Sequence, residues 1–169
     1  DRYKGTVSIN LSAKDFENEG FYRWFAGIVN NYNFPVERLK FELTEGLIVP
    51  ENDDFQYKYK RFDRLGVKLV IDDFGTGYSN LLYLRKMPFN SLKVDKGFIA
   101  DIGSSKSSEE IIKASIAMAK ALNLLVVAEG IETEEQHAFL KENGCDYGQG
   151  YLLAIPLPIE ACLEKIKER

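Results

Sequence analysis

Short segments of alternating apolar and polar residues recur along the chain, separated by longer segments with apolar residues at helical spacing. Residues 7–12 (VSINLS) and 39–44 (LKFELT) alternate strictly, which is typical of half-buried β-strands. Further segments of strand length are residues 67–71, 92–94, 124–128 and 148–153. The helical spacing predicts helices over residues 21–32, 55–65, 81–84, 107–122, 133–143 and 159–166. Capping-box patterns at residues 107–110 and 133–136 mark the start of two of these helices.

Strands that alternate with helices through short connections predict a parallel sheet and an α/β fold. In each of the first five predicted strands an apolar row lies on one face, with a polar residue of opposite parity near the carboxyl end. Phe41 and Leu43, for example, oppose Glu42. A TIM-barrel-like fold gathers such residues from every strand at one rim. A doubly wound sheet would usually show an early glycine-rich phosphate loop, which is not evident here. The parity therefore favours a single barrel-like domain over residues 1–169.

The polar residues at the predicted strand ends share one character, because most of them offer oxygen ligands. They are Asn10, Glu42, Asp72, Asp73, Lys93, Glu129 and Gln149. Four carboxylates at one rim would repel each other, and a bound divalent cation removes that conflict. Oxygen ligands favour Mg²⁺ or Mn²⁺ over zinc, since the only histidine, His137, falls inside a predicted helix. The adjacent aspartates suit a site with two metal ions, and Lys93 could orient water or assist proton transfer.

Each of these residues also has an ordinary structural interpretation when taken alone. An Asp-Asp pair before a glycine often starts a loop, and Lys93 could be a solvated or ion-paired lysine. Glu42 and Glu45 could form the exposed end of a strand. The convergence of seven residues from six strands favours the metal site, and the chemistry alone leaves the reaction open.

Six motifs then identify a family. They are SINLS (8–12), FELTE (41–45), IDDFGTGYS (71–79), LKVD (92–95), VAEGIET (127–133) and GQGY (148–151). In order and spacing they resemble the EAL domain family over the whole chain. The resemblance implies a TIM-barrel-like domain that hydrolyses cyclic di-GMP to linear pGpG with two divalent ions, Mg²⁺ or Mn²⁺.

The resemblance also implies a role for individual residues. The first metal ion is expected at Asn10, Glu42 and Asp72, and the second at Asp72, Asp73 and Glu129. The expected substrate contacts are Asp73, Gly75, Thr76, Gln149 and Pro156.

The expected catalytic set is Lys93, Glu129, Glu45, Glu132 and Gln149. Lys93 matches the lysine that holds the hydrolytic water, and Gln149 lines the site. Glu45 matches the glutamate that anchors the loop after the double aspartate, and Glu132 supports the site from beside it. This loop, residues 74–79, couples the substrate site to a homodimer interface in the family.

Two departures from the family pattern affect what the chain is expected to do alone. The Glu-Ala-Leu motif of the first strand, with its metal-binding glutamate, does not occur in the sequence. Six strands also imply that roughly two strands and a helix are absent at the N-terminus. We therefore expect the C-terminal three quarters of a barrel, weakly active or inactive by itself. In addition, Ala154 and Ile155 replace the small-polar and basic pair that often precedes Pro156. The alternatives are a cyclic di-GMP receptor without turnover and a dimerisation or interaction module.

Composition adds expectations about partners and location. The net charge of -4 gives no electrostatic reason to expect nucleic acid or an anionic membrane as a partner. Two cysteines make no disulfide framework, which fits a cytoplasmic domain. No apolar run is long enough to span a bilayer, and no signal peptide is evident. The start without methionine suggests that the chain is a fragment of a longer protein. We expect that protein to carry other signalling domains. If it is anchored in a membrane, this chain would belong to its cytoplasmic part.

Overall fold

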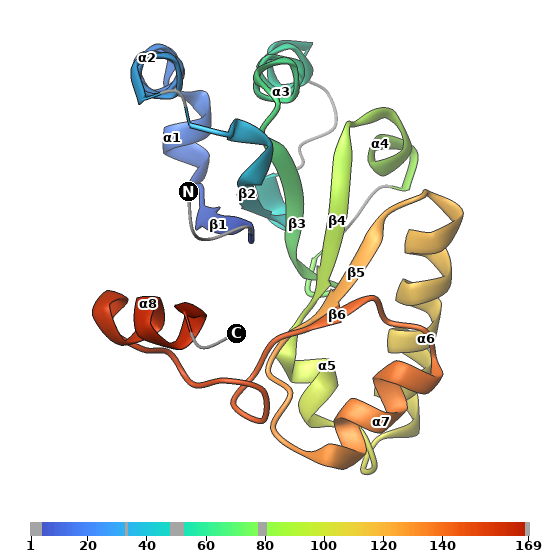
Figure 1. Ribbon diagram of the computed structural model, residues 1–169. Coiled ribbons are helices and arrows are strands. Elements are labelled where there is room, and N and C mark those ends of the chain that lie inside the picture. Colours follow the sequence, from blue (N-terminus) through green and yellow to red (C-terminus); the bar gives the residue numbers. More distant parts are fainter. Residues whose placement is uncertain (1–4, 33, 48–52, 78–80, 168–169) are drawn as a thin grey trace.

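The computed structural model describes residues 5–32, 34–47, 53–77 and 81–167. Within these ranges six strands form one parallel sheet in the order of the sequence. They are β1 (Val7–Asn10), β2 (Leu39–Thr44), β3 (Lys68–Phe74), β4 (Phe89–Val94), β5 (Leu125–Ala128) and β6 (Tyr147–Gly148). The sheet curls into an open half-barrel (Figure 1), which confirms the predicted barrel-like α/β architecture.

The helices follow the strands along the chain. The described helices are α1 (Ala13–Glu17), α2 (Glu19–Tyr32), α3 (Asp53–Leu65), α4 (Leu81–Lys86), α5 (Lys96–Ala100), α6 (Lys106–Ala121), α7 (Glu134–Glu142) and α8 (Ile159–Lys167), with single 3-10 turns η1 (Val36–Arg38) and η2 (Glu45–Leu47). In Figure 1, α8 lies apart from the other helices, on the open side of the half-barrel. None of the helices in the described ranges combines the length and the apolar character needed to cross a membrane.

The core lies between the sheet and the helices on its outer side. The apolar rows of four strands are almost completely buried there: Phe41, Leu43, Leu69, Ile71, Leu92, Val94, Val126 and Ala128. Phe62 from α3 packs edge-on against Phe41, with ring centroids 5.4 Å apart. The predicted apolar rows are thus confirmed for β2 to β5. The edge strand β1 differs, because Val7 and Ile9 remain 44% and 42% exposed.

Two local predictions were wrong. The sixth strand spans only Tyr147–Gly148, because the amides of Leu153 and Ala154 donate to Gly150 O and close a turn. Helix α6 begins at Lys106, where the Ser105 hydroxyl accepts the Ser108 amide, so the predicted box at residues 107–110 does not form. The second predicted capping box, Thr133 with Gln136 at the start of α7, is confirmed.

Candidate functional site

Parallel strands bring their carboxyl ends to one rim of the half-barrel, and the charged residues gather there. Glu42 lies in β2, Asp72 in β3 and Lys93 in β4, while Glu129 and Gln149 directly follow β5 and β6. The side chains point to the inner face because the outer face of each strand is occupied by the apolar row. The structure therefore brings together residues up to 107 positions apart in sequence, counted from 42 to 149.

Lys93 occupies the centre of this group and is only 4% exposed. Its Nζ atom lies 2.6 Å from Glu42 Oε2, 2.9 Å from Asp72 Oδ1 and 2.6 Å from Glu129 Oε1. Burial by itself lowers the pKa of Lys93, but the contacts with the three carboxylates outweigh burial and raise that pKa above its ordinary value. In this arrangement Lys93 is therefore a cation that donates hydrogen bonds to the surrounding carboxylates.

Three carboxylates form a compact acidic cluster beside Lys93. One oxygen atom from each of Asp72, Asp73 and Glu129 lies within 4.8 Å of the other two. Burial, followed by repulsion from Asp72 and Asp95, raises the pKa of Asp73. Burial also raises the pKa of Glu129, although Lys93 opposes that shift. The negative charge of the cluster is thus only partly balanced by the described residues.

The backbone explains how two consecutive aspartates reach the same side. Side chains alternate in a regular strand, so Asp72 and Asp73 would point to opposite faces. The pairing of β3 with β4 is irregular between Ile71 and Phe74, and Asp73 adopts a left-handed conformation with φ of 54°. This conformation is uncommon for a residue with a side chain and is found where the surrounding structure holds it.

The oxygen atoms of this cluster could serve as ligands of a metal ion. Asp72 Oδ1 is buried and, apart from the ion pair with Lys93, accepts no hydrogen bond of good geometry from the described residues. A cluster of carboxylate oxygens, one of them buried with Lys93 as its partner, suits a hard divalent cation. Asp72, Asp73 and Glu129 therefore fit such an ion.

Glu45 fixes the loop that follows the two aspartates. Its side chain is buried, and Oε2 accepts the amides of Gly75 at 2.9 Å and Gly77 at 3.1 Å. The Thr76 hydroxyl donates to Asp73 O at 2.8 Å. A Cβ atom on Gly75 would lie 2.8 Å from the Phe98 ring, so this position needs glycine. The last part of the loop, residues 78–80, lies outside the described residues.

Gln149 and Glu129 are held together by the chain that follows β5 and β6. Gln149 Nε2 donates to Glu129 Oε1 at 2.6 Å. The Gln149 amide donates to Ala128 O at 2.9 Å, and Gln149 O accepts the Ile131 amide at 3.0 Å. A side chain with both a donor and an acceptor thus links the acidic cluster to β6.

The structure does not bring three of the residues expected in the site into the acidic cluster. Asn10 is exposed on β1, where its backbone pairs with Glu42. Glu132 and Pro156 are also exposed. The Glu132 amide donates to Gln136 Oε1 at 2.7 Å. Within the described part of the chain, no hydrogen bond or ion pair joins the side chains of these three residues to the acidic cluster.

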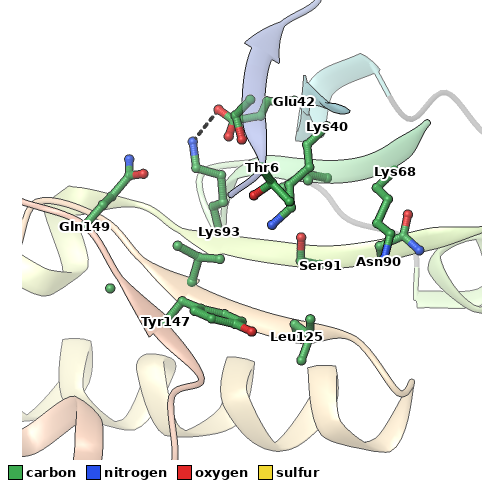
Figure 2. A pocket seen from close by; sticks show the side chains of 14 residues that line it. Thr6, Lys40, Glu42, Lys68, Asn90, Ser91, Lys93, Leu125, Tyr147 and Gln149 are labelled. Carbon is green, nitrogen blue, oxygen red and sulfur yellow. Dashed lines mark hydrogen bonds and ion pairs between the residues drawn. The ribbon is translucent and has the colours of Figure 1, made fainter. Parts of the chain in front are cut away.

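Below the charged rim, the inner face of the sheet lines a cavity of about 450 Å³. Figure 2 shows Lys93 and Glu42 at one end and Lys68 and Asn90 at the other. The strand-end pattern did not predict the lower part of the cavity, which is lined by Thr6, Ser8, Lys40, Lys68, Asn90, Ser91 and Tyr147 among others. Parity could have found several of them, since Lys40 lies two residues before Glu42 and Tyr147 two before Gln149.

A parallel half-barrel with an acidic, lysine-centred rim at the strand ends defines an α/β-barrel protein with a candidate metal site. The EAL domain model matches residues 2–156, and the chain belongs to the EAL domain family. Cyclic di-GMP phosphodiesterase NbdA of Pseudomonas aeruginosa is 50% identical over 129 residues, which are 76% of this chain and 16% of that relative.

Solved structures agree with this assignment. A structure of PaMucR phosphodiesterase in complex with c-di-GMP gives a TM-score of 0.89 at 37% identity, covering 93% of this chain and 64% of that chain. The EAL domain of Mycobacterium smegmatis DcpA also gives a TM-score of 0.89, at 34% identity, covering 96% of this chain and 73% of that one. The chain thus spans only a small part of its curated relatives and less than two thirds of the PaMucR chain.

Proposed function

We propose that the domain to which this chain contributes hydrolyses cyclic di-GMP to linear pGpG with two divalent ions, Mg²⁺ or Mn²⁺. The observation that carries the proposal is the convergence of Asp72, Asp73 and Glu129 within 4.8 Å of one another beside Lys93. The phosphodiesterase activity named for the relative NbdA and the c-di-GMP complex of PaMucR support the substrate.

The proposed metal ligands are those that the family resemblance implies, and the acidic cluster of Asp72, Asp73 and Glu129 supports the second set. Asn10, Glu42 and Asp72 would hold the first ion, and Asp72, Asp73 and Glu129 the second. When bound, such ions activate water and stabilise the oxygens of the reacting phosphodiester. Asn10 requires a side-chain rearrangement for this role, because it is exposed on β1.

The remaining site residues would act through charge and position. Lys93, held as a cation, would offset negative charge on the phosphoryl group. It would donate a hydrogen bond to the attacking water once a metal ion takes over one of its three carboxylate partners. Gln149 orients Glu129 through the bond of 2.6 Å between them. Glu45 would hold the loop at Gly75 and Gly77, and Thr76 is bound to Asp73 O, so that Asp73, Gly75 and Thr76 would contact the substrate. Glu132 and Pro156 are proposed to act beside the site.

We further propose that the 169-residue chain turns over substrate slowly by itself. The described half-barrel is open, its inner face borders a cavity of about 450 Å³, and β1 leaves Val7 and Ile9 exposed. An open edge of this kind destabilises a sheet. A homodimer through the loop after Asp73 is also proposed, and light scattering of the purified chain tests it.

The experiment is an assay of this chain, and of a version extended by its native upstream residues, with cyclic di-GMP and Mg²⁺ or Mn²⁺. Chromatography separates the substrate from pGpG. We expect metal-dependent pGpG formation that is faster in the extended form. Tight binding of cyclic di-GMP without any product in the extended form would contradict the proposal and favour a receptor. Full activity of the short chain would contradict only the proposal about the open half-barrel.

A further inference from the structure

Strand β4 breaks the alternation that its neighbours follow. Phe89 and Leu92 both pack into the hydrophobic core, although they lie three residues apart. Asn90 and Ser91, between them, both line the cavity on the opposite face (Figure 2). A regular strand cannot place residues three apart on one face, because its side chains alternate. β4 therefore contains one extra residue.

The register of the sheet identifies that residue. Leu69 of β3 pairs with Phe89, and the next residue, Val70, pairs with Ser91. Asn90 is thus the unpaired residue of a β-bulge, a feature that is rare between parallel strands and that often redirects a side chain near an active site.

The side chain of Asn90 fastens the bulge to the neighbouring strand. Asn90 Oδ1 accepts the Leu69 amide at 2.8 Å. Asparagine is suited to this contact because its side-chain carbonyl can replace a main-chain acceptor. The bond joins the extra residue of β4 to a β3 residue whose own side chain is completely buried.

The bulge decides which way the rest of β4 faces. Phe89 is held on the outer face, where its ring lies 4.7 Å from that of Tyr59. If β4 were regular from Phe89 onwards, Leu92 would face the cavity and Lys93 would face the hydrophobic core. A charged amine in that core would be strongly unfavourable. With the bulge, Lys93 reaches Glu42, Asp72 and Glu129.

We propose that Asn90 is a positioning residue for Lys93: its hydrogen bond to Leu69 holds the bulge that lets β4 bury Phe89 and direct Lys93 into the acidic rim. The consequence for turnover rests on the proposed function, whereas the positioning itself does not. Asn90 acts through Lys93 and lies at the far end of the cavity from Glu42 (Figure 2).

The test measures how fast individual lysines react in the folded chain. Brief acetylation with acetic anhydride, followed by mass spectrometry, gives a rate for Lys93 and for Lys40 and Lys68, which line the same cavity from β2 and β3. In Asn90→Ala and Asn90→Leu we expect Lys93 to react about fivefold faster than in the wild type, the factor that corresponds to one lost side-chain hydrogen bond. The rates of Lys40 and Lys68 should not change.

Asn90→Asp is the matched control, because its carboxylate can accept the same amide while the size of the side chain is kept. Asn90→Asp should therefore show slow labelling of Lys93, as in the wild type. If Asn90 only filled space, Asn90→Leu would also show slow labelling. Unchanged Lys93 labelling in folded Asn90→Ala and Asn90→Leu would overturn the proposal.

A general rise at all three lysines in every variant except Asn90→Asp would assign Asn90 to the folding of the whole sheet, and would also overturn it. Labelling needs neither metal nor turnover, so failure of this proposal is distinguishable from failure of the proposed function. If cyclic di-GMP is not hydrolysed but Lys93 responds as expected, the positioning role stands and the proposed function falls. In an active form, Asn90→Ala should lower kcat more than it raises KM.

Discussion

The outer and inner faces of the same sheet differ in chemistry although their residues alternate one by one. Phe41 on the outer face is 1% exposed and packs against Phe62, whereas its neighbour Glu42 faces inwards and pairs with Lys93. The outer face gains stability from apolar burial. The inner face brings like charges together, which is unfavourable without a cation. One strand thus carries stability on odd positions and chemistry on even ones, and variants at adjacent residues should separate the two.

Glu42→Ala should produce the largest effect on the inner face. We expect the rate of metal-dependent cyclic di-GMP hydrolysis to fall by more than about 100-fold. Changing a residue that only supports a metal ligand typically lowers activity by about 10- to 100-fold, and removing a ligand itself should cost more. The free energy of unfolding should change by no more than about 2 kcal/mol, because Lys93 retains two carboxylate partners. Product chromatography and urea unfolding measure the two quantities. Persistent hydrolysis in Glu42→Ala would remove Glu42 from the metal site.

Phe41→Ala, one residue away, should show the reverse. Removal of a buried phenylalanine ring typically lowers the free energy of unfolding by about 3–5 kcal/mol. The affinity of the remaining folded protein for Mn²⁺ should stay unchanged, because Phe41 faces away from the rim. Unfolding curves and calorimetric Mn²⁺ titration of the folded variant test both statements. Phe41→Leu is the control, with a smaller loss of stability. Equal losses of stability in Phe41→Ala and Glu42→Ala would break the comparison.

Gly150→Ala should lower both stability and metal affinity, each by an intermediate amount. A Cβ atom at Gly150 would lie 2.2 Å from both the N and O atoms of Ile131. The backbone must move, which separates Gln149 from Glu129, and overpacking typically costs about 1–3 kcal/mol. Thermal unfolding and Mn²⁺ titration should show a lower midpoint together with weaker binding. Gly46→Ala, where a Cβ atom meets nothing within 4 Å, is the matched control. A stable Gly150→Ala with unchanged Mn²⁺ affinity would contradict this coupling.

The smallest effect should be a pH dependence of stability that comes from the acidic cluster. The pKa values of Asp73 and Glu129 are raised above their ordinary values of 3.8 and 4.5. The folded state then binds more protons than the unfolded state, so their contribution to stability is lost as the pH rises through the raised pKa values.

In the presence of a chelator, the loss of stability with rising pH should be smaller in Asp73→Asn than in the wild type. Urea unfolding between about pH 4 and pH 7 measures this loss, because raised carboxyl pKa values fall in that interval. Added Mn²⁺ should also reduce it in the wild type. A wild-type profile identical to that of Asp73→Asn would mean that burial and the neighbouring carboxylates do not raise the pKa of Asp73.

The sequence predicted those parts of the fold that depend on local alternation. The apolar rows from Phe41 to Ala128 were predicted because each strand needs one buried face. The inward direction of Lys93 was also predicted, since residues 92–94 alternate by themselves. The bulge at Asn90 was not, because it depends on a hydrogen bond to Leu69, 21 residues earlier in the chain.

The site itself was only partly predictable for the same reason. The carboxylates of Asp72 and Asp73 were expected together, but alternation would separate them, and it is the left-handed φ of Asp73 that joins them. The family resemblance predicted that Glu45 anchors the loop after the two aspartates. In the structure, Glu45 accepts hydrogen bonds from the amides of Gly75 and Gly77 in this loop. The predicted sixth strand was too long because the amides of Leu153 and Ala154 close a turn on Gly150 O, which the alternation pattern does not show.

The central claim is that the inner rim is a divalent metal site built from Asp72, Asp73 and Glu129. Calorimetric titration of Mn²⁺ into the metal-free chain and into Asp73→Asn tests it most directly, because the measurement needs no substrate and no turnover. We predict saturable binding by the wild type, and at least about tenfold weaker binding by Asp73→Asn with no decrease in the unfolding midpoint of the metal-free protein. Absence of binding, or equal binding by both proteins, would contradict the account.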